Sequence, residues 1–241
     1  MSLKPPKKSD LKKPWMNKPD RVIKIRPEYH LIVTEGTGTE PAYFGAIQKI
    51  INKDYPEKIQ LKVLGVGDNT IKLFGKAKRL AKDNQNGYRH VWIVYDTDDF
   101  LAEHIDRVVQ LCAENSSDEI EYHAIWSNQC IELWFLLHFD FLQSDIHRSE
   151  YWPKLTEYLK KIGAGEYAKN RTDMYHILRP YMDTAIENAR SLNAINYRKA
   201  PSKAAPGTKV YELVEELVKY LPEEVQEKFG GNESCSVNRT E

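Results

Sequence analysis

Cysteine is scarce in this chain of 241 residues, which also lacks a long apolar run and an excess of charge. Its three cysteines, Cys112, Cys130 and Cys235, are odd in number and widely spaced, which fits neither a disulfide framework nor a zinc site. Free cysteines favour a reducing compartment, so we expect a cytoplasmic protein. No apolar run approaches the roughly 18 residues of a membrane span, and the N-terminus lacks the apolar core of a signal peptide. We therefore expect no membrane partner.

The charges cancel over the whole chain, because 35 Lys and Arg residues balance 35 Asp and Glu residues. The total charge therefore does not predict a polyanionic partner, although basic residues gather in two stretches. The first is the Lys- and Pro-rich segment 1–27, which predicts a disordered arm that either tethers nucleic acid or is simply solvated. The second is 190–209, which contains no acidic residue.

A hydrophobic content of 41% is enough for a core, in one large domain or in a domain with an appendage. Strand-like and helix-like segments alternate in the first part of the chain, which predicts an α/β domain over 28–142 with a parallel sheet and right-handed crossovers. The later pattern is helical. We expect a helical extension over 143–228 that packs on this domain, and a mobile tail over 229–241.

Four strands and three intervening helices are predicted in the α/β domain. Apolar or alternating runs predict strands at 29–34, 59–66, 90–95 and 119–126, and amphipathic spacing predicts helices at 41–52, 70–82 and 103–113. If the strand order is 2-1-3-4, the first and third strands are neighbours. A site between their ends then falls at the topological switch point, where open α/β sheets bind ligands.

Three carboxylates, Asp96, Asp98 and Asp99, follow the third predicted strand directly. Their mutual repulsion and desolvation cost free energy, and a bound cation would relieve that cost. Oxygen ligands without thiols favour Mg²⁺ or Mn²⁺. The alternative is an acidic turn in which one aspartate caps the next helix.

The first predicted strand ends in a short acidic loop, EGTGTE over residues 35–40. Its two glycines let the backbone turn tightly and approach a ligand closely. Thr37 and Glu40 have the spacing of a capping box, with Pro41 near the first helical position. The loop lacks the motifs of a P-loop and of a dinucleotide fold. Together with Glu35, three or four carboxylates should meet at one sheet edge, a site suited to metal-assisted phosphoryl chemistry.

The segment 130–141 is strongly apolar and predicts a helix with Glu132 near its start. This acid either favours the helix dipole or, in so apolar a setting, needs a partner such as a metal ion. His138 falls nearly on the opposite side of an ideal helix, and a lone histidine there is more often a hydrogen-bonded core residue. Further helices are predicted at 151–162, 174–195 and 210–220, with an exposed loop at 196–208.

Phosphoryl chemistry needs a cation near the metal ions, and Lys169 and Arg171 are candidates, although a solvated loop explains either one singly. An acidic pocket repels a phosphodiester, so affinity for nucleic acid must come from cations elsewhere. The candidates are the N-terminal arm and the segment 190–209. In this segment we consider four basic residues, of which we expect the last three at the rim of the metal site: Arg190, Arg198, Lys199 and Lys203.

Several motifs together resemble known families. A strand that ends in Glu-Gly and a later strand that ends in Asp-x-Asp resemble a Toprim domain, the metal-binding module of topoisomerases, primases and certain nucleases. Over about residues 28–220 the chain is more closely similar to the RloB-like family. The similar motifs are TEGTGTEPAYF (34–44), YDTDD (95–99), SNQCIELWFLLHF (127–139), AIENA (185–189) and TKVYELV (208–214).

The resemblance implies a Toprim-like parallel four-stranded sheet flanked by helices, and a Mg²⁺- or Mn²⁺-dependent nuclease of bacterial phage defence or abortive infection. RNA and DNA both remain open as substrates, and the family is often encoded beside an ATPase, of AAA or ABC type. Gln129 and Ile131 depart from the Pro and Phe expected there. Residue by residue, the resemblance implies metal-binding acids at Glu35, Asp96 and Asp98, the second acid of the Glu loop at Glu40, and motif positions at Glu132 and His138. Together with the candidates chosen from the residues alone, we expect metal ligands at Glu35, Asp96, Asp98, Asp99 and Glu132, and catalytic groups at Glu35, Glu40, Asp96, Asp98 and Lys169.

Two other classes of function remain open from the residues. The acidic site could serve a metal-dependent phosphatase or nucleotidyl enzyme that acts on a small phosphorylated substrate. A HAD-type phosphatase is disfavoured because Phe100 stands where its motif needs Thr or Val. The chain could also be a non-catalytic module that binds nucleic acid or a partner ATPase. Metal-dependent cleavage separates the three classes.

Overall fold

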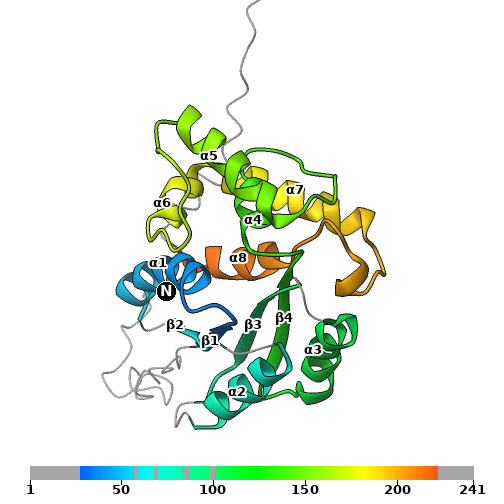
Figure 1. Ribbon diagram of the computed structural model, residues 1–241. Helices are drawn as coiled ribbons and strands as arrows, with labels where there is room; N and C mark the ends of the chain where they lie inside the picture. Colours follow the sequence, from blue (N-terminus) through cyan, green and yellow to red (C-terminus); the bar gives the residue numbers. More distant parts are fainter. Residues whose placement is uncertain (1–27, 57–58, 68–69, 84–86, 98–100, 222–241) are drawn as a thin grey trace, which may run out of the picture.

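Four parallel strands form one sheet in the order β2-β1-β3-β4, so the condition for a site at the switch point is met. The computed structural model describes residues 28–56, 59–67, 70–83, 87–97 and 101–221, and the predicted arm and tail lie outside these residues. Because β1 lies beside β3, their carboxyl ends are adjacent (Figure 1). The strands are β1 (Glu28–Thr34), β2 (Ile59–Gly65), β3 (His90–Asp96) and β4 (Glu121–Ser127).

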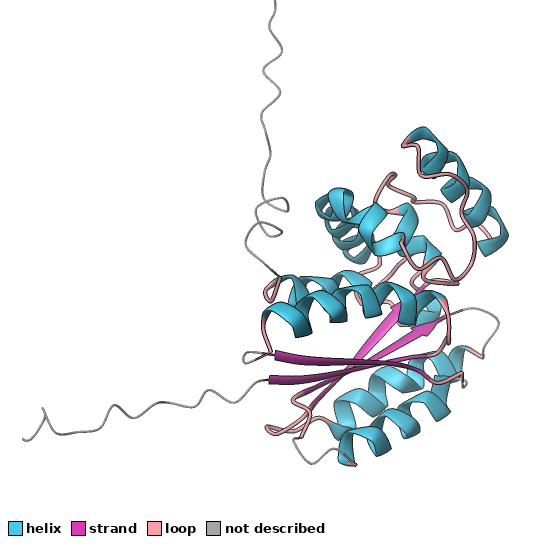
Figure 2. Cartoon of the chain, turned by 90° about the vertical axis from the view of Figure 1, so that its left-hand side faces the viewer, coloured by secondary structure: helices cyan, strands magenta, loops and turns pink. Residues whose placement is uncertain are grey.

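Helices cover both faces of the sheet (Figure 2). On one face lie α1 (Thr39–Asp54) and α8 (Val210–Val218), and on the other α2 (Thr70–Lys82) and α3 (Ala102–Asn115). Successive residues of β1 point to opposite faces, so Ile32 packs on the α1 side while Leu31 and Val33 pack on the α2 side. Burial on both faces explains why β1 and β3 are continuous apolar runs. The predicted α/β fold is confirmed.

The rest of the chain is a helical portion that packs against α1 and the sheet in one hydrophobic cluster. After α7 (Met182–Ile195) the chain returns to the edge strand β4, where Ser127 and Thr208 form an antiparallel bridge, and α8 then contacts β4.

None of the helices in the described ranges has the length and apolarity to cross a membrane. The remaining helices are α4 (Glu132–Leu136), α5 (Tyr151–Lys161), α6 (Met174–Leu178) and α7 (Met182–Ile195).

Two predicted helices are shorter than expected. The helix predicted at 130–141 is regular only over α4, because the N–H groups of His138 and Phe139 bond to carbonyls three residues back. The helix predicted at 174–195 is divided into α6 and α7 by a 3₁₀ turn over Arg179–Tyr181. Pro180 lies in this turn, and proline has no N–H for the helical ladder.

Three local predictions were wrong. The helix α1 starts at Thr39 with Gly38 as its N-cap and no side-chain cap, so Thr37 does not form the predicted capping box. In α2, the helical spacing of Ile71 and Phe74 predicts that both point inward, but Ile71 is exposed and Leu73 is buried instead. The segment 196–208 is not simply an exposed loop, because it contains a 3₁₀ turn and its Thr208 is buried against β4.

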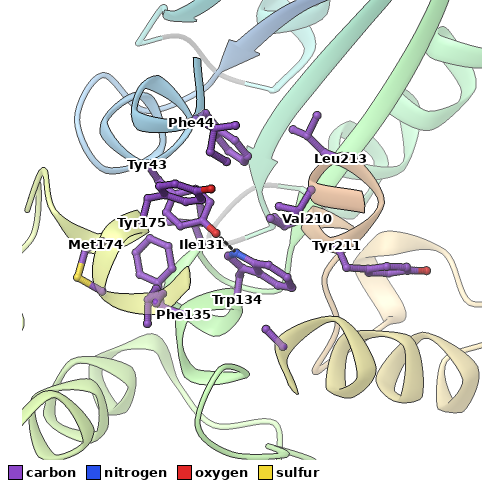
Figure 3. Close-up of a cluster of buried hydrophobic side chains, with 14 of the residues drawn as sticks. Tyr43, Phe44, Ile131, Trp134, Phe135, Met174, Tyr175, Val210, Tyr211 and Leu213 are labelled. Carbon is purple, nitrogen blue, oxygen red and sulfur yellow. Dashed lines mark hydrogen bonds between the residues drawn. The ribbon is translucent and has the colours of Figure 1, made fainter. Parts of the chain in front are cut away.

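A buried aromatic cluster joins α1 to the helical portion (Figure 3). Trp134 of α4 donates a 3.0 Å hydrogen bond from Nε1 to the hydroxyl of Tyr43. Phe135 and Tyr175 contact the Tyr43 ring at centroid distances of 5.3 and 5.7 Å. These residues are almost completely buried. The cluster therefore fixes where α4, which begins with Glu132, lies relative to the start of α1.

We predict that Tyr43→Phe lowers the free energy of unfolding by about 1–3 kcal/mol, because it leaves the buried Trp134 N–H without an acceptor. Tyr175→Phe is the matched control. Its hydroxyl is buried without a hydrogen-bond partner among the described residues, so stability should be unchanged or higher. Urea denaturation of both variants measures the difference, and equal losses would contradict the prediction.

Candidate functional site

Glu35 and Asp96 lie side by side at the carboxyl ends of β1 and β3. The pairing of Thr34 with Val94 sets this position, and the Glu35 N–H continues the ladder with a 2.9 Å bond to the Val94 carbonyl. The Asp96 N–H in turn donates to Glu35 Oε2 at 3.3 Å. Both acidic residues are partly exposed. The structure thus brings these two predicted residues together at the switch point of the sheet.

A pocket of about 470 Å³ opens at this point and collects most of the predicted acids. Its wall carries four carboxylates, and two cations lie on its lining. The lining residues with charged side chains are Glu35, Glu40, Asp96, Glu132, Arg148 and Lys169.

Glycines shape the loop between β1 and α1. The Gly36 N–H donates to Glu40 Oε1 at 3.3 Å, and a Cβ on Gly36 would overlap that carboxylate. A Cβ on Gly38 would overlap the Asn170 side chain, which also accepts a 3.4 Å bond from the Thr39 hydroxyl. The two glycines therefore let the backbone lie close to the side chains of Glu40 and Asn170, while the predicted approach to a ligand stays a prediction.

Glu40 is buried, with 5% of its surface exposed. Burial raises the pKa of the Glu40 carboxyl above its ordinary value, and the nearby charge of Glu132 raises it further. The N–H of Gly36 and the charge of Lys169 act in the opposite direction. Repulsion between Glu40 and Glu132 is therefore an electrostatic cost within this pocket. The repulsion predicted among Asp96, Asp98 and Asp99 stays a prediction, because Asp98 and Asp99 lie outside the described residues.

Glu132 is the first residue of α4 and is only 3% exposed. It accepts a 2.7 Å hydrogen bond from the Tyr167 hydroxyl. This partner comes from the loop between α5 and α6, which also carries Lys169. The buried acid therefore has a hydrogen-bond partner, and it contributes to the pocket wall from the helical portion.

Lys169 and Arg171 have different surroundings. Lys169 lines the pocket, and its ammonium group lies 5.9 Å from the centre of the Trp152 ring. Arg171 does not line the pocket and instead holds the loop in shape. It forms two hydrogen bonds with Asp173, at 2.7 and 2.8 Å, and donates to the carbonyls of Ala164 and Glu166.

The sequence predictions missed Arg148 and Trp152 as pocket residues. Gln129 positions the first of them, because its side chain accepts from the Arg148 N–H at 2.7 Å and donates to the Ile146 carbonyl. The backbone of Gln129 has a φ of 55°, which a proline cannot adopt. The presence of Gln129 in place of the expected proline was therefore the sequence feature that could have indicated this contact with Arg148.

His138 lies away from the pocket, as the helical spacing predicts. It is 1% exposed, and its Nδ1 atom is 2.9 Å from the Trp134 carbonyl oxygen. Burial lowers the pKa of His138 to about 3, so this imidazole is neutral at ordinary pH. It packs against Trp134 in the core.

None of the basic residues of 190–209 lines the acidic pocket. Arg198 and Lys199 line a separate hollow that shares no residue with it. Ser202 bonds to Asp106, which holds this segment against α3. Arg190 is paired with Glu215 at 2.7 Å. Lys203 is exposed.

The side chains of the pocket suit a hard divalent cation. Mg²⁺ is commonly held by one or two carboxylates together with water and substrate phosphates, and Glu35 and Asp96 offer such oxygen atoms. Within the described ranges, the pocket has no three side chains placed closely enough to form a complete protein cage. The predicted ligands Asp98 and Asp99 lie outside the described residues.

One protein-family model, described as RloB-like protein, matches residues 30–217. The match includes every charged residue that lines the pocket. No curated protein and no solved structure matches the chain.

We predict that Glu40→Gln stabilises the metal-free protein at pH 7 by on the order of 1 kcal/mol, because it removes a buried charge and keeps an oxygen for the Gly36 N–H. The folded carboxyl has a raised pKa, so stability falls as pH rises from the unfolded value through the folded one. The gain should therefore shrink towards pH 4. Urea denaturation at several pH values tests this, with exposed Glu119→Gln as control; a gain that is independent of pH would contradict it.

Proposed function

We propose, from the premise that the chain belongs to the RloB-like protein family, that it is a metal-dependent nuclease which hydrolyses phosphodiester bonds of nucleic acid in bacterial phage defence. The observation that carries the proposal is the acidic pocket, where four carboxylates and two cations from distant parts of the chain line one space. Carboxylates hold the metal ions of phosphoryl-transfer enzymes, and cations offset the charge of the phosphate.

The roles of the pocket residues follow from their positions. Glu35 and Asp96 would hold Mg²⁺ or Mn²⁺, which when bound supplies an activated water molecule and charge compensation at the phosphate. Glu40 is suited to hold or move a proton, since burial raises its pKa above the ordinary value. Lys169 and Arg148 would bind the non-bridging oxygens of the phosphate.

Trp152 favours a nucleic acid over a small phosphorylated substrate. Its ring lines the pocket and is 42% exposed. A nucleic-acid base can stack on such a ring, at about 1–3 kcal/mol per base, whereas a small sugar phosphate cannot use it in this way. The ring lies beside Lys169, so a stacked base and its phosphate could both be bound. We also propose that an ATPase encoded nearby is a partner of this protein, and the assay below therefore includes it.

A cleavage assay tests the activity with single-stranded RNA, tRNA, and single-stranded and duplex DNA, with Mg²⁺, Mn²⁺ or EDTA, and with or without the neighbouring ATPase. We expect cleavage that EDTA abolishes and that Glu35→Gln and Asp96→Asn each reduce by about 100-fold or more. Exposed Glu119→Gln makes the same charge change elsewhere and should keep full activity. Release of phosphate from small substrates alone would instead support a phosphatase, and no metal-dependent turnover would support a binding module.

We predict separate effects for Lys169 and Trp152, which both line the acidic pocket. Lys169→Ala should lower turnover by about 10-fold or more, and Trp152→Ala should weaken binding of single-stranded substrate by about 10-fold. Lys161→Ala is the matched control, because this exposed lysine lies 5.0 Å from the centre of the Tyr158 ring on the same helical portion. If the control variant lost as much turnover and affinity, the rim would not be the phosphate-binding surface.

The basic segment gives a further prediction about affinity. Replacing Arg198, Lys199 and Lys203 together with Ala should weaken nucleic-acid binding by about tenfold and flatten the logarithmic salt slope by about two units. Stability should hardly change, because exposed charges contribute little to it. Fluorescence anisotropy in Ca²⁺ at several salt concentrations measures this, against the control triple variant at the exposed residues Lys49, Lys53 and Lys82. Equal affinities and slopes for both variants would identify the segment as a connector only.

A further inference from the structure

Histidines lie at the start of three neighbouring strands, at the sheet end away from the acidic pocket. His30 of β1 is paired with His90 of β3, and His123 of β4 is paired with Trp92, onto whose ring it stacks at 3.9 Å. Since β3 begins at His90 and ends at Asp96, about 20 Å separates this end from the pocket. The group is therefore a different site from the one proposed above.

Three atoms of this group have the spacing of metal ligands. His90 Nδ1 lies 3.1 Å from His123 Nε2 and 3.5 Å from Glu121 Oε2. The latter two atoms are 3.8 Å apart. Nitrogen and oxygen ligands of a tetrahedral zinc ion, bound at about 2.0–2.2 Å, are about 3.4 Å from one another. The observed triangle therefore matches one face of such a tetrahedron.

The surroundings hold these ligands in the orientation that binding requires. His90 Nε2 lies 3.2 Å from Glu28 Oε1, so a proton on Nε2 would be bound there and the Nδ1 lone pair would face the ion. Arg89 pairs with the other oxygen of Glu121 at 3.1 Å. This carboxylate–histidine arrangement is the usual outer shell of a zinc site.

A neighbouring group of Glu28, His30 and His90 is also compact but is a poorer site. Trp92 Nε1 donates to His30 Nδ1 at 3.3 Å. A neutral His30 must then carry its proton on Nε2, the atom that would have to bind the ion. His30 Nε2 is buried and has no hydrogen-bond partner in the described part of the chain. His30 thus supports the ring of Trp92 and is not a ligand.

We propose that His90, Glu121 and His123 bind one divalent transition-metal ion of the zinc type, with the fourth position open to solvent. The side chains of Glu121 and His123 are 40% and 28% exposed, so an ion can reach them. Glu212 and Glu216 of α8 add negative charge around His123. Imidazole and carboxylate ligands favour Zn²⁺, Co²⁺ or Ni²⁺ over Mg²⁺. The ion would tie the edge strand β4 to β3.

Titration of the full chain with Co²⁺ tests the proposal without any nuclease readout. We expect the visible absorption of a four-coordinate ion at about one equivalent, displaced by Zn²⁺, with a rise in melting temperature on Zn²⁺ addition. His123→Gln and Glu121→Gln should abolish the absorption. Glu28→Gln removes the charge of the carboxylate that orients His90 and should weaken affinity by about 10–100-fold.

Three controls separate this site from others. Cys235→Ser removes a thiol that could bind zinc, and Asp96→Asn and Glu35→Gln alter the acidic pocket; all three should keep the Co²⁺ absorption. Circular dichroism in EDTA checks that each variant folds. If His123→Gln does not fold, Glu121→Gln alone tests the site. No absorption in the native chain, or an unchanged spectrum in Glu121→Gln, would show that His90 and His123 merely share a hydrogen bond.

Discussion

The parallel pairing of β1 with β3 is the contact on which both ends of the sheet depend. At the carboxyl end, the register that joins Thr34 to Val94 leaves Glu35 next to Asp96. At the amino end, the same register places His30 beside His90. Each crossover helix returns the chain to the edge of the sheet where the previous strand began, so all strands end at the opposite edge. Polar side chains collect at the two edges, while the strand interiors stay apolar.

The acidic pocket is completed by segments that are far away in sequence. The helical portion contributes Glu132 from α4 and Lys169 from the loop after α5, and the aromatic contact between Trp134 and Tyr43 fixes how that portion meets α1. Two carboxylates, Glu40 and Glu132, are thereby buried close to each other at a cost in free energy. Such a cost is typical of sites that bind or react, since packing alone would favour apolar residues there.

Most elements were predictable because their cause is local. Buried strands and amphipathic helices follow from hydrophobic period, and α2 occurs at the predicted residues 70–82. The failures had causes of other kinds. The end of α4 depends on how 137–141 pack, and Pro180 divided a segment whose apolar period continued across it. Arg148 and the strand-start histidines were not recognised as site residues, because each meets partners from other segments of the chain.

The sequence by itself determined the α/β class and pointed to Glu35 and Asp96 as acids at the ends of two strands. It could do so because parallel strands end at a common edge of the sheet. Only the tertiary structure decided that Lys169 meets this pocket, that Arg171 shapes a loop, and that Arg198 lies at a separate hollow. Those positions depend on how α4 to α8 pack on the sheet. Hydrophobic periodicity indicates local secondary structure and does not indicate contacts between segments so far apart in the sequence.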